Sequence, residues 1–373
     1  MAKMGWLRKR RTMVALCLVL VLTALFVQPA TVYAAKPDAA TTSDSTIQIV
    51  PKVTYPFSPY STPQGEIPKG HSGEQFANIT GSLGALPEGM SRYAIVIGSN
   101  FEGSTAPDGV VPPLIPPFEI QLNYAENDAS DMADLLEYGY GFNVTELSGE
   151  DASRDNILDA ITQLQAIEER GDEVVFFYSG HGAQRIQSKK EAGTRGWGAI
   201  HEGIVTDEGD DNDVGFIWDD ELKRAFQHYD TDRIVFIFDS CLSGGMTELA
   251  KKGRIVCMAT TKTGMAAEAG EFELPDGTTL TINHGLFTYF VLGALSGLVP
   301  EAELFDHDSN PQTLDVTIEE AFNFASGTLK AISPDIMEGL ALYEQLLGLP
   351  EGSLTSLWGT PTIVDRFKQD LLP

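Results

Sequence analysis

The chain has 373 residues, 43% of them hydrophobic and 21% charged, which is enough for one large globular domain with extensions or for two smaller ones. It carries 25 Lys and Arg against 53 Asp and Glu, and its formal net charge is −28. This acidic excess argues against nucleic acid or an anionic membrane as a partner, and it favours cations and basic substrates.

The first 34 residues have the features of a signal peptide. Five basic residues precede an apolar run over residues 13–27, and small residues follow at Val32 and Ala34. This pattern predicts cleavage after Ala34 and therefore a secreted or cell-envelope protein. The alternative is an uncleaved membrane anchor, for which the apolar run is short, and only in that case do we expect membrane contact. Cleavage would leave 20 basic residues against 53 acidic ones, a net charge of −33.

Residues 35–90 are rich in Pro, Ser, Thr and Gly and have no helical period. We expect an extended arm or linker there. Apolar residues at 47–50 and around Val53 predict that this arm docks on the following domain, near its cleft.

Residues 91–300 alternate apolar strands with helices, as one domain would. Strands are expected at residues 93–97, 142–147, 172–178, 233–238 and 254–259, and helices at residues 123–138, 151–170, 219–226 and 285–295. Ser153 is the predicted N-cap of the second helix, and Ile167 is predicted on its apolar face. The alternation, with near-continuously apolar strands, predicts an α/β fold with a mainly parallel sheet covered on both faces.

Three other segments complete the domain prediction. A Pro-rich insertion at residues 104–118 is expected beside the cleft, and residues 183–213 are polar and Gly-rich, with no helix or strand assigned. Residues 301–373 are expected to form a helical extension packed on the domain, with helices at 318–331 and 335–347 and an irregular end.

Two predicted strands lead into reactive side chains. His181 follows the strand at 172–178, and Cys241 follows the strand at 233–238. In open α/β sheets the site lies at the carboxyl ends of the strands, so neighbouring strands would bring imidazole and thiol to one crevice. A Cys beside a His can exist as the nucleophilic thiolate. Taken singly, each residue is more simply explained as a satisfied polar side chain or as buried filler.

The second cysteine downstream of the signal segment is Cys257. A disulfide between Cys241 and Cys257 is the one bridge available after cleavage, but a catalytic Cys241 must be free. Cys257 lies in an apolar, strand-like run, so we expect a small buried hydrophobic residue there.

The sequence resembles the metacaspases and related bacterial caspase-like cysteine peptidases. The two signature blocks are matched by YSGHG at residues 178–182 and by DSCLSG at residues 239–244. Further matching blocks occur in the family's order at residues 93–98 (YAIVIG), 127–128 (ND), 219–222 (DDEL) and 285–289 (GLFTY). The resemblance implies the caspase-like three-layer α/β/α sandwich.

The resemblance also implies roles for individual residues. Cys241 would attack the scissile carbonyl, and His181 would protonate the leaving amine and then activate water. Backbone N–H groups of Gly182 and Cys241 would stabilise the oxyanion. Asp128, Ser179 and Asp239 would line the S1 pocket, the site for the P1 residue before the scissile bond.

An S1 pocket with two carboxylates would select Arg or Lys at P1. Protein or peptide substrates with a basic P1 residue are therefore expected, and the protein is expected to be a monomer. Basic residues near the signature blocks are candidate self-cleavage points, although each is also an ordinary exposed residue: Lys189, Lys190, Arg195, Lys251, Lys252 and Arg254.

The resemblance also makes Ca²⁺ a candidate cofactor, since Asp219 and Asp220 match family positions that bind it. Two features depart from the family pattern. The family's upstream Asp-Gly element is not matched, and Leu242 replaces a His that is common after the nucleophile.

Two other functions remain open at this point. A legumain-like or gingipain-like peptidase shares the strand–His-Gly and strand–Cys layout, but the Asp-Ser-Cys block and the Asn-Asp element favour the metacaspase type. A non-catalytic caspase-like module would bind partners at the cell surface, but such modules usually lose Cys or His, and both are present here.

Overall fold

The computed structural model describes most of the region between residues 89 and 367 and two short segments before it. The described residues are 47–50, 53–55, 89–101, 110–111, 121–186, 200–208, 214–273, 279–296 and 316–367. The predicted signal peptide, most of the arm and most of the Pro-rich insertion lie outside them, as do three self-cleavage candidates, Lys189, Lys190 and Arg195.

A mainly parallel sheet forms the centre of the domain. Among the described residues it has six strands, in the order β14-β11-β10-β6-β3-β5. The strands are β3 (Arg92–Gly98), β5 (Asn143–Ser148), β6 (Glu173–Ser179), β10 (Arg233–Asp239), β11 (Arg254–Met258) and β14 (Thr362–Asp365). All neighbours pair in parallel except β14, which runs antiparallel to β11. Every residue of β6 is buried, as expected for a strand covered on both faces.

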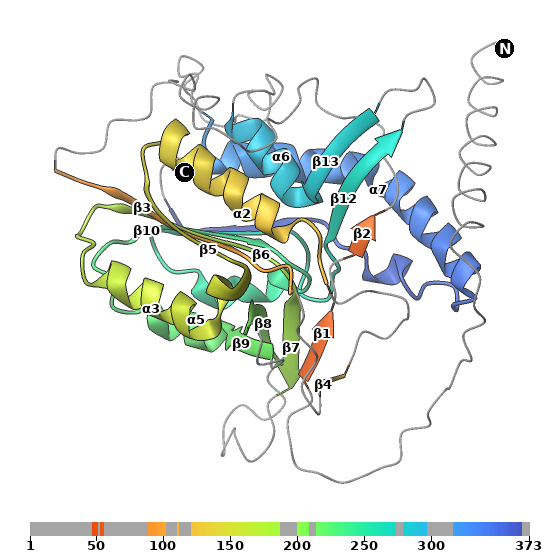
Figure 1. The fold of residues 1–373 in the computed structure, drawn as a ribbon, viewed down its shortest axis with the longest axis horizontal. Helices are drawn as coiled ribbons and strands as arrows, with labels where there is room; N and C mark the ends of the chain where they lie inside the picture. The colour runs from red at the N-terminus through yellow and green to blue at the C-terminus, as the bar shows by residue number, and fades with distance from the viewer. Residues whose placement is uncertain are drawn as a thin grey trace, which may run out of the picture. The chain divides into compact units, whose positions relative to one another are not determined.

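Helices cover both faces of this sheet (Figure 1). One face carries α2 (Ala125–Asp134), its π-helical continuation η1 (Leu135–Gly139), α6 (Leu286–Leu295) and α7 (Ile318–Leu347). The other face carries α3 (Arg154–Gln165) and α5 (Asp219–Ala225). Buried apolar side chains form a separate cluster on each side, with Phe290 in one and Phe226 in the other. The predicted three-layer caspase-like sandwich is therefore confirmed.

Smaller sheets flank the carboxyl ends of the central strands. One has the order β4-β1-β7-β8-β9, and the other has the order β13-β12-β2. Their strands are β1 (Ile47–Val50), β2 (Val53–Tyr55), β4 (Val110–Val111), β7 (Gly182–Ile186), β8 (Ile200–Asp207), β9 (Val214–Trp218), β12 (Ala267–Glu273) and β13 (Thr279–Gly285). The polar, Gly-rich segment to which the sequence analysis assigned no strand therefore contributes to β7 and β8, which pair antiparallel.

The second predicted helix is shorter than expected. The Ser153 side chain accepts a hydrogen bond from the Asn156 N–H at 3.4 Å, so the predicted N-cap is confirmed. The helix ends at Gln165, and Ile167 is 59% exposed, so its predicted place on the apolar face is wrong.

The C-terminal region differs from the prediction at Pro334, where two helices were expected. α7 is one helix, begun by a capping box between Thr317 and Glu320. Pro334 removes one intrahelical donor, but Pro334 and Lys330, four residues earlier, are both exposed, so water can satisfy the freed carbonyl. The tail beyond α7 supplies β14, an edge of the central sheet.

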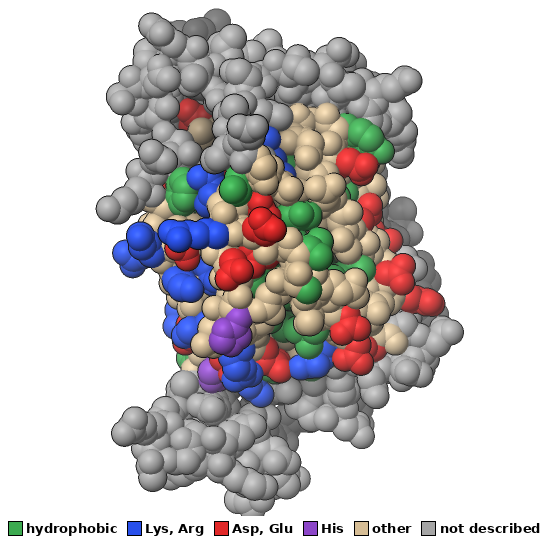
Figure 2. Space-filling view, turned by 90° about the vertical axis from the view of Figure 1, so that its left-hand side faces the viewer, with side chains coloured by type: hydrophobic (Ala, Val, Ile, Leu, Met, Phe, Trp, Pro, Cys, Tyr) green, Lys and Arg blue, Asp and Glu red, His purple; other side chains and the backbone are tan. Residues whose placement is uncertain are grey.

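The surface shown in Figure 2 mixes charge signs, with Lys and Arg gathered along one side and hydrophobic atoms scattered between polar ones. Within the described ranges, no helix is both long enough and apolar enough to cross a bilayer.

Glu173 holds the starts of three central strands together. Its carboxylate accepts a hydrogen bond from Arg92 Nε of β3 at 2.8 Å and pairs with Arg233 of β10. Its side chain is only 4% exposed, so removing the charge leaves two arginines without their buried counter-ion. We expect Glu173→Gln to lower the free energy of unfolding by about 3 kcal/mol in urea titrations.

The control is Glu338→Gln, on the exposed side of α7. It should change the free energy of unfolding by less than about 0.5 kcal/mol. If the two substitutions changed the free energy of unfolding equally, Glu173 would not be holding the three strand starts together.

Candidate active site

The two reactive side chains leave the same edge of the central sheet. β6 and β10 are parallel neighbours, and their register places Asp239 opposite Ser179. His181 and Cys241 each follow two residues after this pair, so both enter the loops above one strand boundary. Both residues are buried, each about 1% exposed.

The loop that carries His181 packs directly on the loop that carries Cys241. A Cβ atom placed on Gly182 would lie 1.8 Å from the carbonyl oxygen of Cys241, so only glycine fits there. The Gly180 N–H also donates to the carbonyl oxygen of Asp239 at 3.3 Å. These backbone contacts join the two predicted catalytic loops, with Gly182 packed against the Cys241 backbone.

The sulfur of Cys241 has a backbone donor. The Ala266 N–H donates to Cys241 Sγ at 3.2 Å, and the Ala266 carbonyl oxygen lies 3.8 Å from the same sulfur. A hydrogen bond to sulfur favours the thiolate over the thiol. Cys257, by contrast, is a free buried cysteine on β11, and burial raises the pKa of its thiol. Cys257 is therefore the small buried residue that the sequence predicted.

The residue after Cys241 has an uncommon backbone conformation. Leu242 has φ 60°, in the left-handed region that non-glycine residues rarely adopt, and its N–H donates to the Gly264 carbonyl at 2.9 Å. Such conformations persist where surrounding structure enforces them, and they cluster at functional sites. Here the turn redirects the chain immediately after the sulfur.

Tyr178 and Phe101 fix the surroundings of His181. The Tyr178 hydroxyl lies 2.8 Å from the carbonyl oxygen of His181 and 2.7 Å from that of Val205, and burial raises the pKa of the phenol. The Phe101 ring meets the imidazole edge-on, with ring centroids 5.7 Å apart. The backbone and the ring of His181 are therefore both held by buried aromatic residues.

The structure also brings the predicted S1 residues together. Ser179 Oγ donates to Asp128 Oδ2 at 2.6 Å, which joins the end of β6 to α2. Asp239 Oδ2 accepts from the N–H and the hydroxyl of Thr288, at 3.0 and 2.7 Å. Asp128 also accepts from the N–H of Gly285. Both carboxylates therefore contact the N-terminal turn of α6, where the helix dipole favours negative charge.

Sequence reasoning missed His284, Thr288, Tyr178 and Phe101 as parts of the site. His284 Nδ1 lies 2.9 Å from Asp128 Oδ1, although the two residues are 156 positions apart. A conspicuous signal was available only for His284, a histidine directly before the matched Gly-Leu-Phe-Thr-Tyr block.

Two strands of the arm lie on either side of the site. β1 pairs antiparallel with β7, with Val50 opposite Gly182. β2 pairs in parallel with β12, with Val53 opposite Ala267, the neighbour of the residue that donates to Cys241 Sγ. Only two residues separate β1 from β2 in the sequence.

The predicted metal residues lie in a separate cluster. His201, Asp219 and Asp220 each offer a ligand atom, all within 4.8 Å of one another. His201 Nδ1 lies 3.0 Å from Asp219 Oδ1 and 4.0 Å from Asp220 Oδ1. Burial raises the pKa of the Asp219 carboxyl, even though its hydrogen bond with His201 acts against this.

This donor set fits Ca²⁺ only in part. Ca²⁺ takes about six to eight oxygen ligands, and the two aspartates supply that kind of donor. An imidazole nitrogen is instead typical of transition-metal sites. Within the described ranges, buried His201 Nε2 and Asp220 Oδ1 have no hydrogen-bond partner, so both remain available as ligand atoms.

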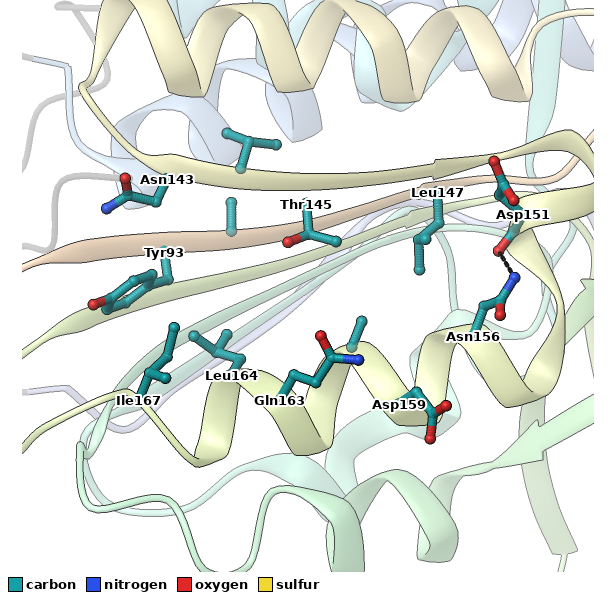
Figure 3. Close-up of a pocket in the computed structure, with 13 residues that line it drawn as sticks. Tyr93, Asn143, Thr145, Leu147, Asp151, Asn156, Asp159, Gln163, Leu164 and Ile167 are labelled. Carbon is teal, nitrogen blue, oxygen red and sulfur yellow. Dashed lines mark hydrogen bonds between the residues drawn. The ribbon is translucent and has the colours of Figure 1, made fainter.

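A groove of about 750 Å³ lies elsewhere, between α3 and the outer strands β3 and β5 (Figure 3). Tyr93, Thr145 and Gln163 are among the residues that line it, and none of the predicted site residues does so. The buried Cys–His region is therefore not part of this groove.

Comparison with known proteins places the chain among caspase-type proteins. The caspase domain family matches residues 91–326. Metacaspase-4 of Arabidopsis thaliana is 30% identical over 172 residues, covering 44% of this chain and 36% of that protein. Metacaspase-1 of Plasmodium falciparum (isolate 3D7) is 29% identical over 177 residues, covering 44% of this chain and 26% of that protein. The chain thus spans well under half the length of these relatives.

Solved structures resemble the chain more distantly. A protein from Geobacter sulfurreducens has 20% identity and a TM-score of 0.39, covering 56% of this chain and 83% of its own. Caspase-1 from Spodoptera frugiperda has 10% identity and a TM-score of 0.33, covering 79% and 94%. The family match spans more than half of the chain and includes both strand ends that carry His181 and Cys241. The chain therefore belongs to the caspase domain family.

Proposed function

We propose that this chain is a cysteine endopeptidase that cleaves after Arg or Lys, with Cys241 as nucleophile and His181 as acid–base partner. The observation that carries the proposal is the backbone contact between Gly182 and Cys241, which joins the two signature loops of a caspase domain. Protein or peptide substrates follow from the peptidase family.

The chemistry is acyl transfer to sulfur. The Cys241 thiolate, supported by the Ala266 N–H, attacks the scissile carbonyl carbon and forms a C–S bond. The N–H groups of Gly182 and Cys241 would stabilise the resulting oxyanion. His181 then protonates the leaving amine as the C–N bond breaks. It next takes a proton from a water molecule, which hydrolyses the thioester and restores the thiol.

A basic P1 preference is supported by the acidic residues beside the strand ends. Ser179 donates a hydrogen bond to Asp128 and lies opposite Asp239 in the strand register, and these are the three residues for which the resemblance implies P1 binding. A P1 Asp would meet like charge there, which disfavours binding.

Two fluorogenic peptides test the nucleophile and the P1 preference together, one with Arg and one with Asp at P1. We expect the Arg peptide alone to be cleaved, and Cys241→Ala to lower kcat/KM by about 10³-fold or more, because the nucleophile is lost. Cys257→Ala is the matched control and should retain cleavage, since its thiol is buried on β11. Cleavage of the Asp peptide would overturn the P1 assignment, and cleavage by Cys241→Ala would overturn the nucleophile.

We also propose that the arm restrains the enzyme until the arm is removed. The support is that β1 and β2 form strand pairs on either side of the buried Cys241, where an extended peptide would bind by adding a strand.

Self-processing is a separate proposal, at basic residues within the domain. Of the self-cleavage candidates after Cys241, Lys251 and Lys252 are exposed. Arg254 is 2% exposed within β11, which argues against cleavage after it in the folded protein.

A specific protease site inserted between residues 60 and 85 tests the restraint. After cutting and removal of the arm, we expect kcat/KM for the Arg peptide to rise at least tenfold, because two strand edges become available to substrate. The uncut protein, treated with the same protease without the inserted site, is the control. An unchanged rate after verified loss of the arm would contradict the restraint.

A cation at Asp219 and Asp220 is proposed as an activator, with Ca²⁺ as the candidate. When bound, it would supply positive charge among carboxylates whose burial raises the pKa of Asp219 and of Glu202. His201 would either turn its unbonded Nε2 toward the cation or release the contact between its Nδ1 and Asp219.

Metal titrations test this directly. We expect millimolar Ca²⁺ to raise the thermal midpoint of the chelator-treated protein, and Asp219→Asn/Asp220→Asn to abolish that rise, because both oxygen ligands lose their charge. A His201→Gln variant separates the metals: it should preserve a response to Ca²⁺ and weaken a response to Zn²⁺. No shift with Ca²⁺ in the parent protein would contradict Ca²⁺ binding.

The proposed location is outside the cytoplasm, as a monomer. This rests on the basic, apolar and small-residue pattern of the first 34 residues. It also fits the strongly negative charge of the remaining chain, which would keep copies apart and soluble.

A further inference from the structure

His284 lies buried between two aspartates of α2. Its Nδ1 is 2.9 Å from Asp128 Oδ1, and its Nε2 is 3.2 Å from Asp131 Oδ2. The three side chains are each no more than 6% exposed. A neutral imidazole has one donor nitrogen and one acceptor nitrogen, so it could satisfy only one of the two carboxylates. The geometry therefore requires the imidazolium, which donates to both.

The surroundings of His284 favour the charged form. Burial alone would lower the pKa of the imidazole, but the hydrogen bonds and charges of Asp128 and Asp131 outweigh it and raise the pKa to about 9. From α6, the Tyr289 ring lies 6.2 Å away between centroids. From β12, the buried Glu268 stands opposite Gly285 in the strand pairing, with its carboxylate turned to the N–H groups of Asn123 and Tyr124.

Asp128 already has donors on both carboxylate oxygens. Oδ1 accepts hydrogen bonds from His284 Nδ1 and from the Gly285 N–H. Oδ2 accepts from Ser179 Oγ and, at 3.1 Å, from the same Gly285 N–H. A carboxylate has about four acceptor positions, and these contacts engage them. The His284 imidazolium is thus shared between Asp128 and Asp131, and the three side chains together keep a net charge of −1.

Asp239 differs in its partners. Its Oδ2 accepts hydrogen bonds from the N–H and the hydroxyl of Thr288, in the first turn of α6. These contacts fix Asp239 at the end of β10, two residues before Cys241.

We propose that His284 is a positioning residue for P1 selection, which locks Asp128 onto Ser179 and Gly285. This rests on the proposed cleavage after Arg or Lys. Without the lock, Asp128 repels Asp131 and the Ser179 contact loosens, so the P1 pocket loses its shape.

Three variants separate positioning from plain structural support. His284→Asn keeps one amide donor for Asp128 but removes the cation and the contact with Asp131. Asp131→Asn removes the second carboxylate. The double variant His284→Asn/Asp131→Asn restores the net charge of the group and so guards against failure of the single variant to fold.

Steady-state kinetics with the Arg peptide give the first readout. We expect His284→Asn to raise KM at least tenfold with a smaller change in kcat, and the double variant to return KM to within about threefold of the parent value. An unchanged KM in folded His284→Asn would overturn the proposal.

The pH profile gives the second readout. The stabilisation from a raised histidine pKa is complete below its ordinary value near 6.5 and is lost as pH rises through about 9. The P1 guanidinium keeps its charge over this range. The parent KM should therefore rise between pH 8 and pH 10, and the KM of the double variant should not. Parallel profiles would overturn the proposal.

A third measurement keeps this proposal separate from the proposed function. If the parent protein cleaves no Arg peptide, the function fails, and urea midpoints at pH 7 and pH 10 then test the lock alone. A larger loss of stability for the parent than for the double variant supports the ion-paired lock. An equal loss overturns it.

Discussion

The common register of three parallel strands is the constraint on which the site depends. β3, β6 and β10 end at one level, since Gly98 pairs with Ser179 and Ser179 pairs with Asp239. This common boundary sets the positions of His181 and Cys241, because each lies two residues beyond it. Glu173 and its two arginines fix the opposite ends of the same strands, so a slip of one strand would break an ion pair at one end and separate imidazole from thiol at the other.

The acidic groups beside this boundary are organised by one helix. α6 directs its first N–H groups at Asp128 and Asp239, through Gly285 and Thr288. Burying carboxylates is costly unless they are hydrogen-bonded, and the free N–H groups of a helix start are well suited to that task. The same arrangement ties α2, β6 and β10 to α6, so one set of contacts both satisfies the buried carboxylates and joins the layers.

The sequence was informative wherever the signal was local. Near-continuous apolar runs predicted the five parallel strands to within one or two residues, and they placed His181 and Cys241 just beyond the ends of two of these strands. What it could not provide were contacts between distant segments. The strands β7 and β8 are polar and Gly-rich on their own, and they become strands by pairing with each other and with β1. His284 is likewise unremarkable until β13 brings it against α2. Pro334 led to the wrong prediction of two helices, because an exposed helical turn tolerates the loss of one backbone hydrogen bond.

The docked arm has a consequence for the behaviour of the chain in solution. β1 and β2 complete one edge each of β7 and β12. A chain that has lost them presents two rows of unpaired backbone donors and acceptors, which are open to any extended segment and therefore also to other copies of itself. Under the proposed restraint by the arm, the form that accepts a peptide is thus also the form most prone to aggregate. Its net negative charge, which sets copies in mutual repulsion, then becomes a protection against self-association.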